Sequence, residues 1–420
     1  MMPMLFYVLL SVLCATLILL WWLRWSDYAQ SAAVCRRVSL KLEKTVALEE
    51  KIGWKNRMNG VSPRVSVVVT SSNQAEALRR NLPAMLEQNF DCYEVIVVDE
   101  ASTDGTSEVL KQLSAVYSHL RHTFVPASAR YLSRSKLAVT LGVRAARAPW
   151  VVITKADCRP SGNSWLTCLS AFFEDDCDFV LGYASYADDG TPVARRAIYE
   201  RLRRQMIAGR MALGHFFVSA VTHPCGKAVW ADSANMAFRK SVFMQGQGYS
   251  GSLTVPFGED VHLVDALALG GRTEIVFHPE SSVLQELPEQ REIVARRVRL
   301  SEILRHVGRR GRCFRIREGA ATFFLFLFWG IGGLYLFLTL HEINTLGRYD
   351  MSRLWLDIPV LLLVCAGALM PGWLLRRVVR LLGERQFSWY YMGWRALATP
   401  FSNKIICLKR WIVRRDLVRR

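Results

Sequence analysis

The sequence lacks any pair of cysteines in Cys-x-x-Cys spacing, although it contains ten cysteines among its 420 residues. That absence excludes the short zinc and dithiol motifs that depend on such pairs. Scattered cysteines are typical of reduced cytosolic thiols, so we expect no disulfide framework. Internal repeats and low-complexity tracts are also missing, which excludes repeat architectures.

Charged residues are missing from Met4–Leu23, an apolar run about long enough to cross a bilayer. Trp21, Trp22 and Trp25 at its end are typical of an interfacial aromatic belt. A cleaved signal peptide is the alternative, but no basic residue precedes the run, and Ser31-Ala32-Ala33 is a weak cleavage signal. We therefore expect an uncleaved anchor whose C-terminal side faces the cytosol, because the basic residues follow it.

Two further runs, Ala320–Leu340 and Leu354–Leu375, have bilayer length. The formal net charge is +18, and basic residues cluster beside the apolar runs and in the tail. This distribution favours anionic membrane lipids as partners over nucleic acid, for which no recognition fold is present. It also predicts a multi-pass protein of the cytoplasmic (inner) membrane, with the intervening domain and the tail on the cytosolic side.

The region between the apolar runs begins with a strand–helix–strand pattern. Val65–Thr70 is a β-branched run, helical spacing follows through Leu86, and Tyr93–Val98 is a second apolar strand. Continuous apolar strands joined by a helix predict a parallel βαβ unit within an α/β fold. Polar residues at the ends of parallel strands line the crevice where such sheets bind ligands; here they are Thr70, Ser72, Asp99 and Glu100.

Val67–Asn73, followed by Val97–Asp104, resembles the opening of family-2 glycosyltransferases. Another nucleotide-binding α/β domain is the alternative. The resemblance covers roughly residues 62–300 and implies a GT-A fold with a mostly parallel sheet. It also implies a UDP- or GDP-linked sugar donor, with the base and ribose against Thr70, Ser72 and Glu100. Carboxylates suit this role because they accept hydrogen bonds from base N–H groups and sugar hydroxyls.

The run Trp150–Cys158 resembles the family's strand that ends in Asp-x-Asp, which implies a site for Mg²⁺ or Mn²⁺ beside the donor diphosphate. Asp157 matches the second acid and is the expected metal ligand. The first acid is replaced by Lys155. This lysine either supplies positive charge to the diphosphate or weakens metal binding by repulsion.

Gly258-Glu259-Asp260 opens a helical stretch, Val261–Leu269, and acids at a helix N-terminus are favoured by the helix dipole. Capping alone would explain them. The resemblance implies more, because the family has an acidic pair here that supplies the general base. By that resemblance Asp260 deprotonates the acceptor hydroxyl and Glu259 helps to place the acceptor.

Three basic residues complete the expected donor site. Lys136 lies in a predicted helix, Ser135–Ala146, where family members place a basic residue near the diphosphate; a solvated lysine is the alternative. Arg296 and Arg299 suit diphosphate recognition, and binding to lipid headgroups is their alternative. The last predicted strand is Thr273–Phe277.

The sequence thus predicts an inverting, membrane-anchored transferase that moves a sugar from a nucleotide donor to a hydroxyl of a lipid-linked sugar or growing glycan. Two alternatives stay open: a lapsed enzyme that binds donor or partners in a glycan-assembly complex, and a processive polysaccharide synthase. The expected domains are an anchor, a linker or amphipathic segment, the GT-A domain, two membrane helices and a basic tail, at 1–25, 26–61, 62–318, 319–376 and 377–420.

Overall fold

The structure is a computed structural model of the 420-residue chain. It describes residues 2–52, 64–126, 133–187, 231–253, 258–268, 272–306, 309–346 and 354–384, with isolated residues between them. Most of the expected basic tail lies outside the described residues. The chain divides into two compact units. The helical unit contains Met1–Ala29, Arg309–Arg380 and Phe387–Arg420, and the α/β unit contains Gln30–Gly308 and Leu381–Gln386.

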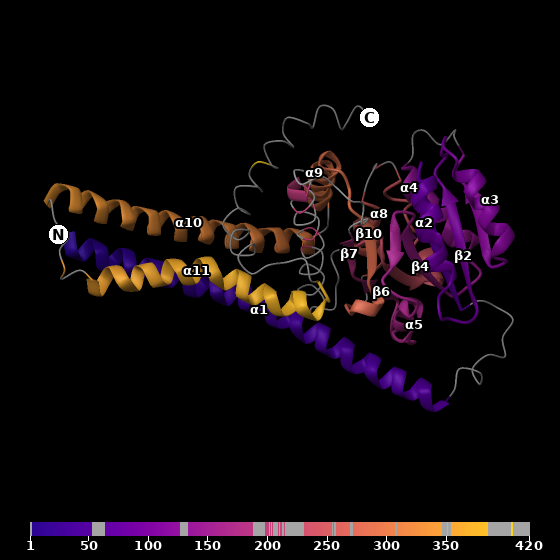
Figure 1. Cartoon of the computed structure of the whole chain (residues 1–420), viewed down its shortest axis with the longest axis horizontal. Helices are drawn as coiled ribbons and strands as arrows, with labels where there is room; N and C mark the ends of the chain where they lie inside the picture. The colour runs from indigo at the N-terminus through magenta and orange to yellow at the C-terminus, as the bar shows by residue number, and fades with distance from the viewer. Residues whose placement is uncertain are drawn as a thin grey trace. The chain divides into compact units, whose positions relative to one another are not determined.

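The α/β unit is built on a seven-stranded sheet in the order β3-β2-β1-β4-β8-β6-β9 (Figure 1). Neighbouring strands run parallel except at β8, which is antiparallel to both β4 and β6. The prediction of an α/β fold with a mostly parallel sheet is confirmed. The strands are Val65–Ser71 (β1), Tyr93–Asp99 (β2), Leu120–Phe124 (β3), Trp150–Lys155 (β4), Phe179–Gly182 (β6), Met236–Arg239 (β8) and Thr273–Val276 (β9).

Helices cover both faces of the central strands, and the alternation of side chains along β1 explains how. Val65, Val67 and Val69 belong to a core cluster with apolar residues of α2 (Ala75–Leu86) and α3 (Thr106–Val116). Val68 points the other way, toward α4 (Arg134–Ala145), where Gly142 allows close approach. A strand buried on both faces needs apolar residues at almost every position, which is the run that the sequence contains.

A second, three-stranded sheet has the order β5-β10-β7, formed by Cys158–Pro160, Val283–Glu286 and Ala184–Ala187. β10 corrects the expectation that the strand near residue 273 is the last. It is only four residues long, and its pairing with β5 and β7 comes from distant parts of the chain. Short helices complete the unit: α5 (Trp165–Ser170), α7 (Lys240–Gln245), α8 (Glu259–Leu267), η3 (Pro279–Ser281) and α9 (Gln290–His306).

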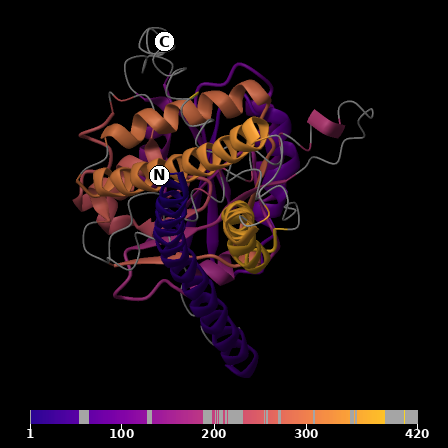
Figure 2. The ribbon, with the colours of Figure 1, turned by 90° about the vertical axis from the view of Figure 1, so that its left-hand side faces the viewer.

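The first helix, α1, runs without a break from Met2 to Ile52 (Figure 2). The expected linker at 26–61 is therefore helical over most of its length. Val38 and Leu42 are buried in the core cluster of the α/β unit, and Lys41 pairs with Glu174 at 2.8 Å. This part of α1 is thus a helix packed on the α/β unit.

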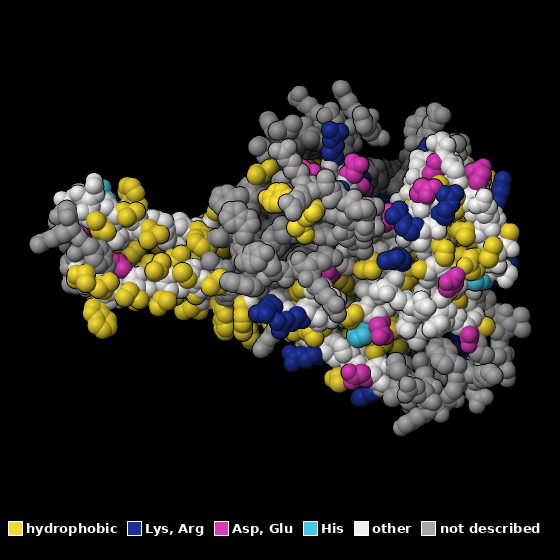
Figure 3. Space-filling model, viewed as in Figure 1, with side chains coloured by type: hydrophobic (Ala, Val, Ile, Leu, Met, Phe, Trp, Pro, Cys, Tyr) yellow, Lys and Arg dark blue, Asp and Glu magenta, His cyan; other side chains and the backbone are white. Residues whose placement is uncertain are grey.

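In the helical unit, α1 packs with α10 (Arg309–Leu346) and α11 (Leu354–Leu381). The buried contacts come from residues spaced by seven on α1 and α10, as expected for long packed helices: Phe6, Leu13, Leu20, Phe328 and Tyr335. The remaining surface is strongly hydrophobic (Figure 3).

Among the described residues, two segments are long and apolar enough to cross a membrane, Met4–Trp22 and Gly319–Thr345. In α11 only the shorter stretch Asp357–Gly367 is apolar. Asp357 accepts a hydrogen bond of 2.7 Å from the hydroxyl of Tyr335. The expected third span is therefore not shown, although a helix is present there.

Candidate functional site

The site lies where the parallel strands end. Register places Thr70 beside Lys155 and Ser71 beside Asp99. Backbone hydrogen bonds continue past the strands, from the N–H of Glu100 to the Ser71 carbonyl at 2.8 Å and from the N–H of Ala156 to the Thr70 carbonyl at 3.0 Å. The ends of β1, β2 and β4 are thus fixed side by side, as expected for a ligand-binding sheet edge.

Of the expected donor residues at the end of β1, Thr70 is buried in the strand, and Ser72, just after it, is exposed. Asp99 is used locally, because its carboxylate accepts hydrogen bonds from the backbone N–H and the hydroxyl of Ser102. Asn73, at φ +52°, accepts from the N–H of Thr103 at 2.8 Å. The Asn73 contact joins the loops after β1 and β2, and the Asp99 contacts fix the loop after β2.

The acidic pair Glu259 and Asp260 begins helix α8, after Gly258 at φ +83°. Glu259 Oε1 lies 3.6 Å from the Nζ atom of Lys155 at the end of β4. The backbone of Glu259 is also fixed, because its carbonyl accepts a hydrogen bond of 2.8 Å from the Tyr249 hydroxyl. The structure therefore joins the acidic pair to the strand-end residues, about 100 positions earlier in the chain.

The surroundings shift the pKa values of the two acids in opposite directions. Burial raises the pKa of Asp260 to about 7, the charge of Glu259 raises it too, and Lys155 partly opposes them. For Glu259, burial also acts to raise the pKa, but the Lys155 ammonium, a backbone hydrogen bond and the charge of Lys136 together outweigh burial, and the pKa is lowered. Burial would lower the pKa of Lys155, but the surrounding carboxylates, Glu259 first, raise it above its ordinary value. One acid is thus kept ionised, and the other titrates near neutrality.

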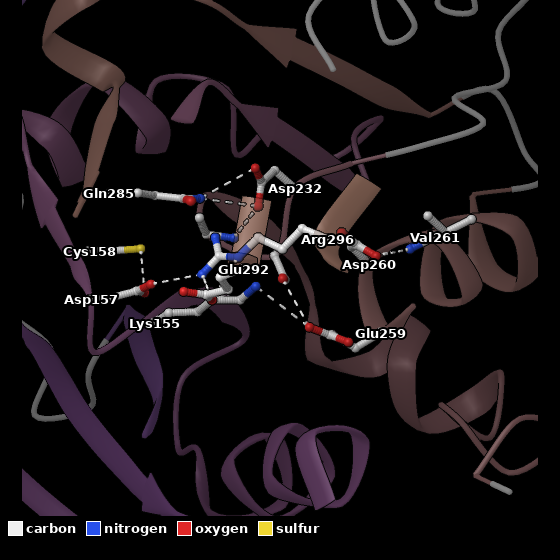
Figure 4. Close-up of polar contacts among 12 residues, drawn as sticks. Lys155, Asp157, Cys158, Asp232, Glu259, Asp260, Val261, Gln285, Glu292 and Arg296 are labelled. Carbon is white, nitrogen blue, oxygen red and sulfur yellow. Dashed lines mark hydrogen bonds and ion pairs between the residues drawn. The ribbon is translucent and has the colours of Figure 1, made fainter. Parts of the chain in front are cut away.

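Asp157, the surviving acid of the expected motif, faces an arginine. Its Oδ2 atom lies 3.6 Å from Nη2 of Arg296, on α9. The same guanidinium pairs with Glu292 at 2.7 Å and donates to the Tyr186 hydroxyl at 3.4 Å. Figure 4 shows the cationic groups of Lys155 and Arg296 among the surrounding carboxylates. The structure thus brings Arg296 to the strand-end residues.

Two residues that the motifs did not indicate join this cluster. Asp232 lies just before β8, and its charge is among those that raise the pKa of Lys155. Gln285, on β10, donates to the Asp232 carboxylate at 3.4 Å. Asp232 is placed by β8, the antiparallel neighbour of β4, and Gln285 lies opposite Cys158 of β5 in the second sheet.

Glu100, expected to contact the donor, follows β2 at the same edge. Burial and the charge of Glu259 together raise its pKa to about 7, although Lys155 acts to lower it. This coupling indicates that Glu100, Glu259 and Lys155 belong to one electrostatic cluster.

Lys136 is neither on the surface nor directed at open solvent. It is fully buried, and its ammonium donates to the carbonyls of Ser252 at 2.8 Å and Val255 at 3.0 Å. Burial lowers its pKa to about 8, although Glu259 and Asp260 act in the opposite direction. Lys136 thus fixes the turn that precedes the acidic pair. The alternative of a solvated lysine is wrong.

Arg299 lies one turn beyond Arg296 on α9 and is partly buried. Its expected role as a donor ligand stays a prediction.

A divalent metal does not fit the residues that surround Asp157. Among the described residues, no group of three or more His, Cys, Asp or Glu is placed to hold a metal ion. Asp157 is already paired with Arg296, and Glu259 with Lys155. A cation at Asp157 would sit beside two positive charges, whereas Mg²⁺ and Mn²⁺ favour clusters of oxygen ligands. We therefore derive no chemical step through a metal.

Comparison with known proteins supports the class that the motifs indicated. Glycosyl transferase family 2 matches residues 66–227, which contain the strand ends described above. Residues 66–227 thus match this family, and the recognition made from the sequence is confirmed.

Curated relatives match parts of this domain. A teichuronic acid biosynthesis glycosyltransferase of Bacillus subtilis strain 168, TuaG, is 26% identical over 137 residues, or 32% of this chain and 53% of the relative. The glycosyltransferase AglE of Haloferax volcanii is 40% identical over 65 residues, 15% of this chain and 21% of the relative. The chain spans about half the length, or less, of these relatives.

Among solved structures, a mannosyltransferase of Pyrobaculum calidifontis in complex with GDP-Man and Mn²⁺ covers 86% of this chain and 98% of its own. Its sequence identity is 19% and its TM-score 0.45. Staphylococcus aureus TarS (residues 1–349) in complex with UDP-GlcNAc covers 81% of this chain and 89% of its own, with 14% identity and a TM-score of 0.39.

Proposed function

We propose that this chain transfers a sugar from a UDP- or GDP-linked donor to a hydroxyl of a membrane-associated acceptor, with inversion at the anomeric carbon. The observation that carries the proposal is the position of Asp260. It is a carboxylic acid with a pKa of about 7, held by α8 beside the strand ends that the family match contains.

The chemistry is a single displacement. The acceptor hydroxyl oxygen forms a bond to the anomeric carbon, while the bond from that carbon to the diphosphate oxygen breaks and the electron pair leaves with the nucleoside diphosphate. The hydroxyl proton passes to the carboxylate of Asp260, whose pKa near neutrality suits a general base. Glu259, kept ionised by Lys155, orients the acceptor.

The donor is held from the strand side. Thr70, Ser72 and Glu100 contact the base and ribose, and Lys155 and Arg296 face the diphosphate. Interactions between these cations and the diphosphate are stronger in a partly buried site than in water, because the local dielectric constant is lower. Because the motif implied Mg²⁺ or Mn²⁺, turnover is to be compared with each ion and with EDTA.

A membrane-associated acceptor, a lipid-linked sugar or a growing glycan, is supported by the two apolar segments Met4–Trp22 and Gly319–Thr345. The basic residues that follow the first segment favour a cytosolic α/β unit and a multi-pass protein of the cytoplasmic membrane. Accessibility of single introduced cysteines in intact cells, in a background without the ten native ones, would test this orientation.

The test of the transferase is turnover of a panel of UDP- and GDP-sugars by the detergent-purified chain, with Mg²⁺, Mn²⁺ or EDTA. We expect donor cleavage with one nucleotide class and a loss of about 100-fold or more in Asp260→Asn, which lacks the base. Asp91→Asn, at an exposed position before β2, is the matched control. Donor binding with no turnover under any acceptor would favour the lapsed, binding-only alternative, and long products from one chain would favour a processive synthase.

A further inference from the structure

The cation at the end of β4 replaces an acid of the motif. Lys155 is the last residue of the strand, in register with Thr70 of β1. Its side chain is about one-third exposed, at 32%, and its ammonium is paired with Glu259. A fixed positive charge therefore stands where the resemblance expects a metal-binding carboxylate.

A second cation faces the remaining acid. The Arg296 side chain is 26% exposed and Asp157 is 13% exposed, so the pair lies at the edge of the site. Glu292, one turn earlier on α9, accepts from the Nε and Nη2 atoms of the guanidinium at 3.0 Å and 2.7 Å, and the Tyr186 hydroxyl accepts from its Nη1 atom. These contacts fix the position of Arg296 before any ligand arrives, which reduces the entropy lost on binding.

The two cations match the chemistry of a diphosphate. The diphosphate of a nucleotide-sugar carries two negative charges, and the leaving nucleoside diphosphate carries more. A guanidinium binds phosphate oxygens through parallel N–H groups, and an ammonium supplies a compact charge. Their carboxylate partners keep both groups protonated, so neither charge depends on pH in the neutral range.

On these contacts, and resting on the proposed transferase function, we infer that Lys155 and Arg296 take the place of a divalent cation, so that this chain binds and stabilises the nucleoside diphosphate without a metal. Asp157 then acts as a positioning residue that holds Arg296, and it is not a metal ligand. On donor binding, the phosphate oxygens join the carboxylate oxygens as partners of the two cations.

The experiment measures binding of UDP and of GDP to the full chain in detergent by calorimetry, once in EDTA and once in Mn²⁺. For the nucleotide that binds, we expect dissociation constants within about threefold of each other in the two conditions. Arg296→Gln should weaken binding in EDTA by about 10- to 100-fold, the range for one charged hydrogen-bonding partner. Arg291→Gln, an exposed arginine on the same helix, is the matched control and should leave the constant unchanged.

Lys155→Asp restores the acid of the motif and gives a second readout. We expect weak nucleotide binding in EDTA and recovery of binding in Mn²⁺. Direct titration of the nucleotide-saturated wild-type chain with Mn²⁺, followed by electron paramagnetic resonance, should show no bound ion, whereas Lys155→Asp should show one. This measurement requires only the wild-type chain if a variant fails to fold.

The outcomes separate the two proposals. Nucleotide binding by the wild type in Mn²⁺ but not in EDTA, or a tightly bound Mn²⁺ ion, would overturn the metal-free site and leave the transferase proposal intact. Binding in neither condition would overturn the transferase proposal, and with it this one. Equal binding in both conditions with no effect of Arg296→Gln would refute the role of the arginine.

Discussion

The raised pKa of Asp260 predicts how the rate of donor turnover depends on pH. The pKa of Asp260 is about 7, against an ordinary value of 3.8. That difference disfavours the ionised form by about 4 kcal/mol, since one pKa unit corresponds to about 1.4 kcal/mol. A general base must be deprotonated, so kcat/KM for donor turnover should rise with pH through about 7 and level off above it.

The perturbation is Glu259→Gln. The Glu259 charge is the second cause of the raised pKa of Asp260, after burial. Two like charges in close proximity interact by about 1 to 4 kcal/mol at an effective dielectric constant near 20, the upper figure being the value at 4 Å. Removing the charge should therefore move the acid limb of the profile down by about one to two pH units. The substitution also removes the carboxylate that pairs with Lys155. The Lys155 charge, which lowers the pKa of Asp260, is then no longer offset by Glu259.

Lys155→Met should move the limb the opposite way, because it removes the charge that lowers the pKa of Asp260. The exposed Asp91→Asn variant should leave the limb in place. The assay is the pH dependence of kcat/KM for the donor that the panel identifies. A limb that stays fixed or moves upward in Glu259→Gln would refute the electrostatic reasoning.

Glu100 requires a separate control, because burial and Glu259 also raise its pKa to about 7. Glu100 and Asp260 both interact with Glu259 and Lys155. The acid limb of the pH profile therefore cannot be assigned to either residue until one of them is substituted. Glu100→Gln should preserve the limb, although donor binding weakens. Loss of the limb in Glu100→Gln would show that Asp260 is not the titrating base.

Two further predictions concern the supports of the site. Lys136→Met removes two hydrogen bonds from a buried ammonium to the carbonyls of Ser252 and Val255. We expect the local stability of this turn to fall by about 2 kcal/mol, measured as faster amide hydrogen exchange. Unchanged exchange in the turn would contradict the role of Lys136. Gly182→Ala places a Cβ against the side-chain amide of Asn235, a buried group that donates to two backbone carbonyls. We expect a loss of about 2 kcal/mol from overpacking, seen as a lower thermal unfolding midpoint, and an unchanged midpoint would show that this contact relaxes freely.

The sequence by itself determined the elements whose cause is local. The β-branched run of β1, the helical spacing of α2 and the acids at the start of α8 are patterns of neighbouring residues, so strand, helix and helix start follow from short-range preferences. It also placed Asp99 and Lys155 at strand ends, because an apolar run stops there. The domain class followed from the same strand–helix–strand order.

Only the tertiary structure decided which side chains meet. The contact between Asp157 and Arg296 requires α9 to return to the end of β4, and no pattern within either segment records that. Lys136 likewise stands in an ordinary helix, and its burial against backbone carbonyls depends on a turn more than 100 residues later. Asp232 reaches the cluster through antiparallel β8. These pairings follow from packing of the whole domain, which buries the apolar faces first and thereby brings distant polar groups together.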